Sequence, residues 1–103
     1  MRRKPKQHSR STKYRDYIQS DRWRALRLKT FSMTNNRCVG CGDKCTECHH
    51  LSYENLGKER IGIDIVPLCS KCHKKCHFKK YWENKKNRAI MSDQLIKKFR
   101  LMS

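Results

Sequence analysis

The chain has 103 residues, of which 36% are hydrophobic, and its 26 lysines and arginines outnumber 9 acids to give a formal charge of +17. This length allows one small domain with a thin core, and the positive charge favours a polyanion such as nucleic acid as the partner. The sequence has no secretion signal, no stretch near about 18 apolar residues and no basic helix with a clean apolar stripe. We therefore expect a cytoplasmic protein without a membrane partner.

The N-terminal third is expected to be an arm followed by a helix. Residues 1–13 carry six basic side chains and no acid, which predicts a disordered arm that either solubilises the protein or contacts phosphates. Residues 14–33 have apolar side chains at helical spacing, with Ser20 suited to be the N-cap and Trp23 on the core face. Residues 14–103 are expected to form a single domain.

Short elements follow this helix, which Asn35 and Asn36 should end. The β-branched content and the turn residues predict a hairpin and then two helices, the last of them capped by Ser92. This order predicts a small α+β fold. The expected elements are a tight knuckle at residues 38–42, a strand at 48–51, a polar loop at 52–62, a strand at 63–68, a helix from 70 to 82 and a short helix after 92.

The cysteines predict a metal site. All seven lie within residues 38–77, and in a cytoplasmic chain such a cluster indicates metal binding rather than disulfides. A Cys-x-x-Cys turn brings two sulfurs to one point, and two such turns complete the tetrahedral thiolate cage that zinc favours. We expect a structural zinc that fastens the hairpin to the following helix. Its ligands are Cys38, Cys41, Cys69 and Cys72.

The other three cysteines, Cys45, Cys48 and Cys76, leave two interpretations open. In one they are small buried apolar residues, which is the commonest role of a free cysteine. In the other they join His77 in a second zinc site, and His77 then has no catalytic role.

Four of the five histidines lie in the same stretch and predict a second centre. His49 and His50 are adjacent, so in a strand one can bind metal while the other faces the opposite side. His73 and His77 are four residues apart and share one face of a helix. Cys72 can therefore face the zinc while His73 faces elsewhere, toward a site made with His77 and with His49 or His50.

Two segments carry a resemblance to a known family. ECHHLSYENLG and DIVPLCSKCHKKCH, preceded by a Cys-x-x-Cys pair, resemble the HNH endonucleases, in which a hairpin and a helix grip one divalent cation. The lead-in YIQSDRWRALRLKTF is similar to the helix before the first knuckle in zinc-bearing members. The resemblance covers about residues 14–80 and implies a ββα-metal finger, with its core at residues 36–80, stapled by a Cys₄ zinc and flanked by helices.

The resemblance also implies roles for single residues. His49, His73 and His77 would hold the catalytic divalent metal, which could be Mg²⁺, Mn²⁺, Ni²⁺ or Zn²⁺. His50 would be the general base that activates water, for which an imidazole has a suitable pKa of about 6.5. Asp64 stands where the family usually has asparagine, and it would either brace the loop near His50 or touch the metal.

The function expected from this resemblance is hydrolysis of DNA phosphodiester bonds, by nicking or double-strand cleavage, in a bacterial or phage-infected cell. One alternative is a zinc-dependent nucleic-acid-binding module with two zinc sites and no catalysis. Another is a structural zinc protein of a ribonucleoprotein assembly. Lysines on the helix after the second knuckle would contact the DNA backbone without reading its sequence; they are Lys74, Lys75, Lys79 and Lys80.

Overall fold

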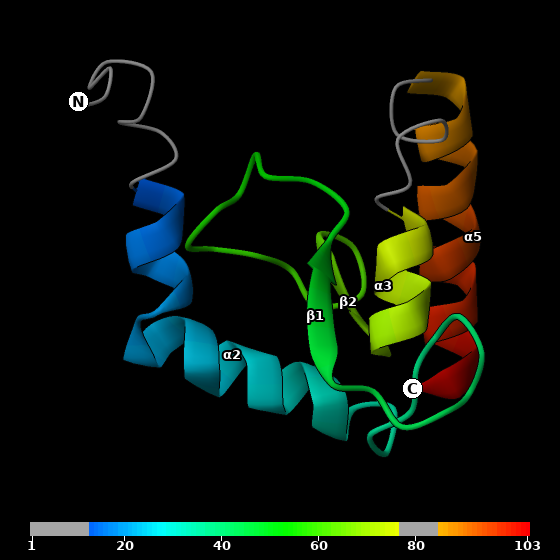
Figure 1. Ribbon diagram of the computed structural model, residues 1–103, viewed down its shortest axis with the longest axis horizontal. Helices are drawn as coiled ribbons and strands as arrows, with labels where there is room; N and C mark the ends of the chain where they lie inside the picture. Colours follow the sequence, from blue (N-terminus) through cyan, green and yellow to red (C-terminus); the bar gives the residue numbers. More distant parts are fainter. Residues whose placement is uncertain (1–12, 77–84) are drawn as a thin grey trace.

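The computed structural model describes residues 13–76 and 85–103. The expected disordered arm, apart from residue 13, and the candidate residues His77, Lys79 and Lys80 therefore lie outside the described residues. The described chain has the predicted small α+β fold, with one two-stranded antiparallel sheet and flanking helices (Figure 1). Its elements are helical residues 13–18, α2 (Asp21–Ser32), β1 (Glu47–His50), β2 (Ile65–Leu68), α3 (Ser70–Cys76) and α5 (Lys85–Met102).

The first predicted helix is divided in two. Ser20 has an extended backbone, with φ −79° and ψ 159°, and its side chain accepts a hydrogen bond from the Trp23 N–H, so it caps α2 as predicted. The same conformation ends the helical turns at residues 13–18, and a single helix over residues 14–33 is therefore wrong. The two helical segments meet at an angle, and α2 passes beside β1 (Figure 1).

The chain leaves α2 through the two asparagines that the sequence indicated. Asn35 and Asn36 have φ values of 55° and 64°, the left-handed conformation that asparagine adopts more readily than most residues. A knuckle follows, in which the Gly42 N–H donates to the Cys38 carbonyl oxygen at 2.9 Å and Gly42 itself has φ 86°. The knuckle returns the chain to the start of β1.

Both strands of the sheet pack against α2 and α3. β1 pairs with β2 in a register that sets His49 opposite Val66 and His50 opposite Ile65. β1 has the expected length but is shifted by one residue from the predicted strand at 48–51. β2 ends where predicted but begins two residues later than the predicted strand at 63–68. All four residues of β2 are buried. The core includes Phe31, Val66, Leu68, Leu95 and Phe99.

The C-terminal helix is longer than predicted. α5 runs without a break from Lys85 to Met102, and Ser92, the expected N-cap, lies inside it. The residues before Ser92 are mostly good helix formers without glycine or proline, so nothing ends the helix there. Leu95 and Phe99 are its buried residues. Among the helices that the structure describes, none has the length and apolar character needed to cross a membrane.

Candidate metal centre and active site

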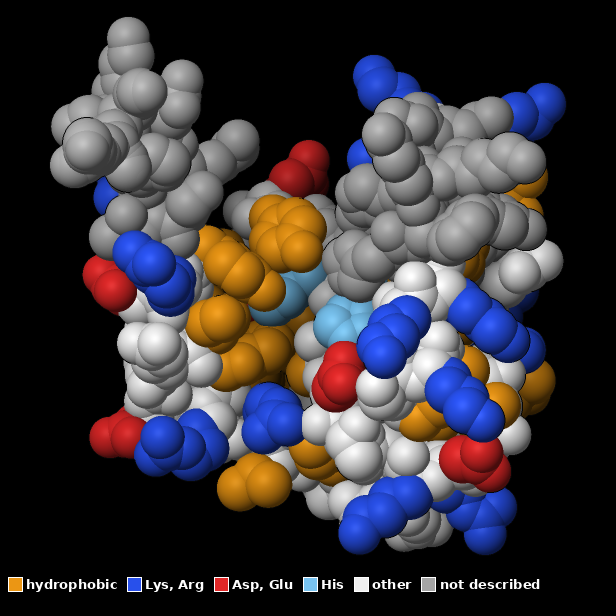
Figure 2. Space-filling view, viewed as in Figure 1, with side chains coloured by type: hydrophobic (Ala, Val, Ile, Leu, Met, Phe, Trp, Pro, Cys, Tyr) orange, Lys and Arg blue, Asp and Glu red, His pale blue; other side chains and the backbone are white. Residues whose placement is uncertain are grey.

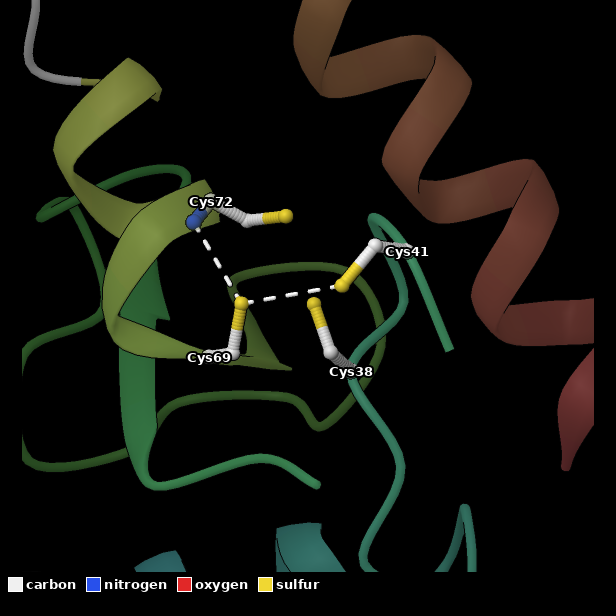
Figure 3. Close-up of side chains that lie close together, drawn as sticks. All are labelled: Cys38, Cys41, Cys69 and Cys72. Atoms are coloured by element: carbon white, nitrogen blue, oxygen red, sulfur yellow. Dashed lines mark hydrogen bonds between the residues drawn. The ribbon is translucent and has the colours of Figure 1, made fainter. Parts of the chain in front are cut away.

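The four cysteines of the two knuckles converge, as predicted. Their sulfur atoms all lie within 4.8 Å of one another, and Cys41 Sγ lies 3.7 Å from Cys69 Sγ (Figure 3). Tetrahedral zinc with Zn–S bonds of about 2.3 Å requires sulfurs about 3.8 Å apart. Cys38 and Cys41 come from the loop after α2, while Cys69 directly precedes α3 and Cys72 lies in its first turn. The cluster can therefore hold a metal ion that joins these two parts of the chain.

Backbone N–H groups donate hydrogen bonds to two of the four sulfur atoms, which favours their thiolate form. The Cys72 N–H donates to Cys69 Sγ at 3.4 Å and lowers the pKa of that thiol to about 7. The Gly40 N–H donates to Cys38 Sγ at 3.2 Å. In contrast, burial and the neighbouring thiols raise the pKa of Cys72 above its ordinary value. Four thiolates are stable together only beside a cation, and zinc binding will release protons from this cluster.

Gly40 is required by the space around the cluster. A Cβ atom on this residue would lie 2.7 Å from Cys72 Sγ, which is closer than side chains pack. The glycine therefore lets the first knuckle approach the helix that carries Cys72.

The remaining cysteines behave as core residues. Cys45 and Cys76 are buried in the hydrophobic core, and Cys48 packs against it. Burial raises the pKa of Cys48 to about 12 and that of Cys76 to about 11, so both thiols stay neutral. Among the residues that the structure describes, the four knuckle cysteines are the one group of three or more candidate ligands whose ligand atoms all converge. The first of the two interpretations, small buried apolar side chains, fits this geometry, and His77 of the second lies outside the described residues.

Two of the expected ligands of the catalytic metal lie next to each other. The His49 ring in β1 and the His73 ring in α3 have centroids 5.0 Å apart in an edge-on arrangement. His73 Nδ1 is paired with the carboxylate of Glu47, two residues before His49 on the same face of β1. Sequence reasoning missed Glu47, although the two-residue period of a strand places it beside His49.

His50 lies on the opposite side of the strand, as the adjacent histidines predicted. Its ring is stacked between Trp23 and Tyr53, with centroid distances of 4.8 Å and 4.9 Å and interplanar angles below 20°. Only 2% of its side chain is exposed. Trp23 thus belongs to the core, as expected, and it packs on a candidate catalytic residue. Tyr53 forms the outer wall of this stack and is 47% exposed.

A buried carboxylate fixes the orientation of His50. Glu59 Oε2 lies 2.7 Å from His50 Nε2, and the Glu59 side chain is fully buried. Its other oxygen accepts hydrogen bonds from the Tyr17 hydroxyl at 2.7 Å and the Gly57 N–H at 3.0 Å. An ionised carboxylate only accepts hydrogen bonds, so beside one His50 would carry its proton on Nε2 and its basic lone pair on Nδ1. Burial and the bond to Glu59 raise the pKa of Tyr17 to about 12.

Sequence reasoning also missed Glu59 and Tyr17. The Tyr17–Glu59 bond joins residues 42 positions apart, and no local pattern indicates such a pair. The sequence offered one signal, which is that Glu59 is an acidic residue in the loop that follows the strand with the two adjacent histidines.

Asp64 braces the loop between the strands. Its buried carboxylate accepts hydrogen bonds from the Arg60 N–H at 2.8 Å, from the Arg60 side chain and from Asn55. Burial alone would raise the pKa of Asp64, but these hydrogen bonds lower it below its ordinary value. The Asp64 carbonyl also accepts from the Leu51 N–H, directly after His50. Of the two roles expected for this residue, this geometry fits the bracing one.

The basic residues of the second knuckle are exposed where they are described. Lys74 and Lys75 lie on the solvent side of α3. Together with the rest of the positive charge they can attract a phosphate backbone.

The chain was compared with known proteins. No family model, no curated protein and no solved structure matches it.

Proposed function

We propose that the protein is a zinc-stabilised, metal-dependent endonuclease of the HNH type that hydrolyses DNA phosphodiester bonds. The observation that carries this proposal is the His49–His73 pair beside Glu47, set on a hairpin and a helix next to a four-cysteine cluster. Imidazole and carboxylate groups together bind divalent cations, and the charge of +17 suits a DNA substrate.

The two metal sites have different roles in this proposal, one structural and one catalytic. The cysteine cluster holds zinc and fastens the first knuckle to α3. His49 and His73, with Glu47 and His77 as further candidates, hold the catalytic cation. When bound, this cation would neutralise charge on the phosphate and help the leaving oxygen depart.

His50 acts in this proposal as the general base, through Nδ1. Glu59 is a positioning residue, because it holds Nε2–H and stabilises the imidazolium that forms when water loses its proton. The stack of Trp23 and Tyr53 keeps the ring in place but also limits the access of water. Displacement of the exposed Tyr53 by a bound DNA strand would bring water to His50.

A plasmid cleavage assay tests this proposal. Zinc-loaded protein is incubated with supercoiled plasmid and Mg²⁺, Mn²⁺, Ni²⁺ or Zn²⁺, and nicked and linear products are measured. We expect cleavage with at least one of these ions, and loss of cleavage in His50→Ala and His49→Ala variants that keep their fold and zinc content. Full activity of His50→Ala would exclude its role as base.

A second candidate function is a nucleic-acid-binding module without catalysis, and the burial of His50 in a paired stack favours it. Metal content distinguishes the two. One tightly held zinc and one weak, exchangeable divalent ion per chain would support the nuclease. Two zinc ions that resist mild chelation, with no plasmid cleavage under any metal, would support the binding module.

A further inference from the structure

A groove of about 480 Å³ leads away from the histidine pair. Helical residues 13–18, α2, β1 and α3 all contribute side chains to its lining. His73 and Glu47 are among its lining residues, so the groove adjoins the candidate catalytic centre. Figure 2 shows hydrophobic side chains gathered between the helices on the left and α3 on the right, with histidine beside them and basic side chains near them.

The floor of the groove is apolar and partly aromatic. It contains Tyr14 and Ile18, from one face of the first helical segment, and Ile18 is 36% exposed. The Tyr14 ring packs edge-on against His50 and Tyr53, with centroids 5.8 Å and 5.5 Å away, and the buried His50 ring limits its movement. A fixed aromatic surface of this kind is suited to contact the flat face of a base.

The rim of the groove is basic. Arg24 and Arg27 lie one helical turn apart on the same side of α2. Arg27 is held by a hydrogen bond to the Thr46 carbonyl at 2.7 Å and by the Phe31 ring, 5.1 Å below its guanidinium carbon. Arg24 has a 68% exposed side chain that pairs with the almost fully exposed Asp21. Such a surface pair is weak, so Arg24 can turn to a phosphate.

We propose that this groove binds an unpaired nucleotide of a DNA strand, with its base against Tyr14 and Ile18 and its phosphate at Arg24 and Arg27. Paired bases in a duplex would offer phosphates to the arginines but leave the apolar floor uncovered. An unpaired nucleotide satisfies both surfaces, and 480 Å³ is ample for one. The inference rests on the proposed function for the choice of DNA and deepens it: the preferred substrate has a single-stranded stretch next to the scissile bond.

Binding measured by fluorescence anisotropy tests the inference without catalysis. Zinc-loaded protein, with no other divalent ion added, is titrated into a labelled short oligothymidylate and into a blunt duplex of equal length. We expect tighter binding of the single strand. Ile18→Ser and Tyr14→Ala should each weaken single-strand binding by up to about tenfold, the size of one base-stacking contact, and change duplex binding little.

The arginines have a matched control on the other side of the protein. Arg24→Ala and Arg100→Ala each remove one charge from an exposed position on a helix, but Arg100 lies on α5. We expect Arg24→Ala to weaken single-strand binding several times more than Arg100→Ala does.

Equal losses in the two arginine variants, or a duplex bound as tightly as the single strand in all variants, would overturn the inference. Failure of plasmid cleavage with this binding pattern intact would exclude the nuclease and leave the groove as a single-strand site.

Discussion

Glu59 connects three separate parts of the chain through one buried carboxylate. Its oxygens bind His50 in β1, Tyr17 before α2 and the backbone of Gly57 in the loop. A buried carboxylate without hydrogen-bond donors would be costly, and these three hydrogen bonds supply the donors that it needs. The residue that orients His50 also holds the N-terminal helical segment against the sheet.

Kinetics can separate the positioning role that we propose for Glu59 from a purely structural one. We expect Glu59→Gln to lower kcat for plasmid cleavage by about 10²-fold, because the neutral amide no longer stabilises a charged His50, and to leave KM nearly unchanged. Glu54→Gln, at an exposed position of the same loop, is the control. A Glu59→Gln variant with the kcat of the wild type would contradict this role.

The hydroxyl of Tyr17 reports on the same network. Its pKa is raised from 10.0 to about 12, so the folded protein favours the neutral phenol. The stability that the neutral Tyr17 phenol contributes is therefore fully present below pH 10. It is lost as pH rises from about 10 to 12, because the unfolded chain releases this proton first.

Ultraviolet absorbance of tyrosinate, taken as the difference between wild type and Tyr17→Phe, measures this titration directly. We expect a midpoint near 12 in the wild type and a lower one when Glu59→Gln removes the nearby charge. A wild-type midpoint near 10 would show that the Tyr17–Glu59 bond is absent in solution.

At the scale of elements, local signals predicted the fold well. The N-cap at Ser20, the left-handed Asn35 and Asn36, and the two Cys-x-x-Cys turns each depend on a few neighbouring residues. The break before Ser20 was missed, because a cap signal states where one helix begins but not whether another helix ends just before it. The uninterrupted α5 was missed because Ser92 has the chemistry of an N-cap but lies within a longer run of helix-forming residues. The Glu59 contacts could not be predicted, since they depend on how distant elements pack.

Phe99 of α5 packs directly on the loop between the strands. A Cβ atom at Gly62 would lie 2.5 Å from the Phe99 ring, and Gly62 has φ 86°. We expect Gly62→Ala to lower the free energy of unfolding by about 2–5 kcal/mol, the sum of left-handed backbone strain and overpacking.

Gly57→Ala is the matched control, because Gly57 has φ 92° but nothing within 4 Å of its Cβ position. It should lose only the backbone part, about 1–2 kcal/mol. Urea unfolding of both variants checks this difference. Equal losses would mean that α5 does not press on the loop.

For the whole molecule, the thin core makes the free energy that a metal in the cysteine cluster would contribute decisive. Only 36% of the residues are hydrophobic, and the charge of +17 opposes a compact state. Zinc bound to four thiolates supplies about 10–16 kcal/mol of apparent binding energy in small domains, and this energy stabilises the fold.

Removal of the metal should therefore unfold most of the protein. We expect a strong chelator to abolish the cooperative thermal transition followed by circular dichroism, and added Zn²⁺, but not Mg²⁺, to restore it. Cys72→Ser should behave like the chelated protein, whereas Cys48→Ser should keep its zinc, because Cys48 lies outside the cluster. A chelated protein with an unchanged melting transition would show that the fold does not depend on the cluster.

Cys72 and His73 are consecutive residues of α3, so one peptide bond joins the cysteine cluster to the histidine pair. One inserted residue between them would rotate His73 by about 100° around the helix axis and carry its ring away from His49. A deletion would rotate it by the same angle in the other direction. In evolution, this junction can therefore accept neither an insertion nor a deletion, while the loop between the strands has no such restriction on the spacing of the two centres.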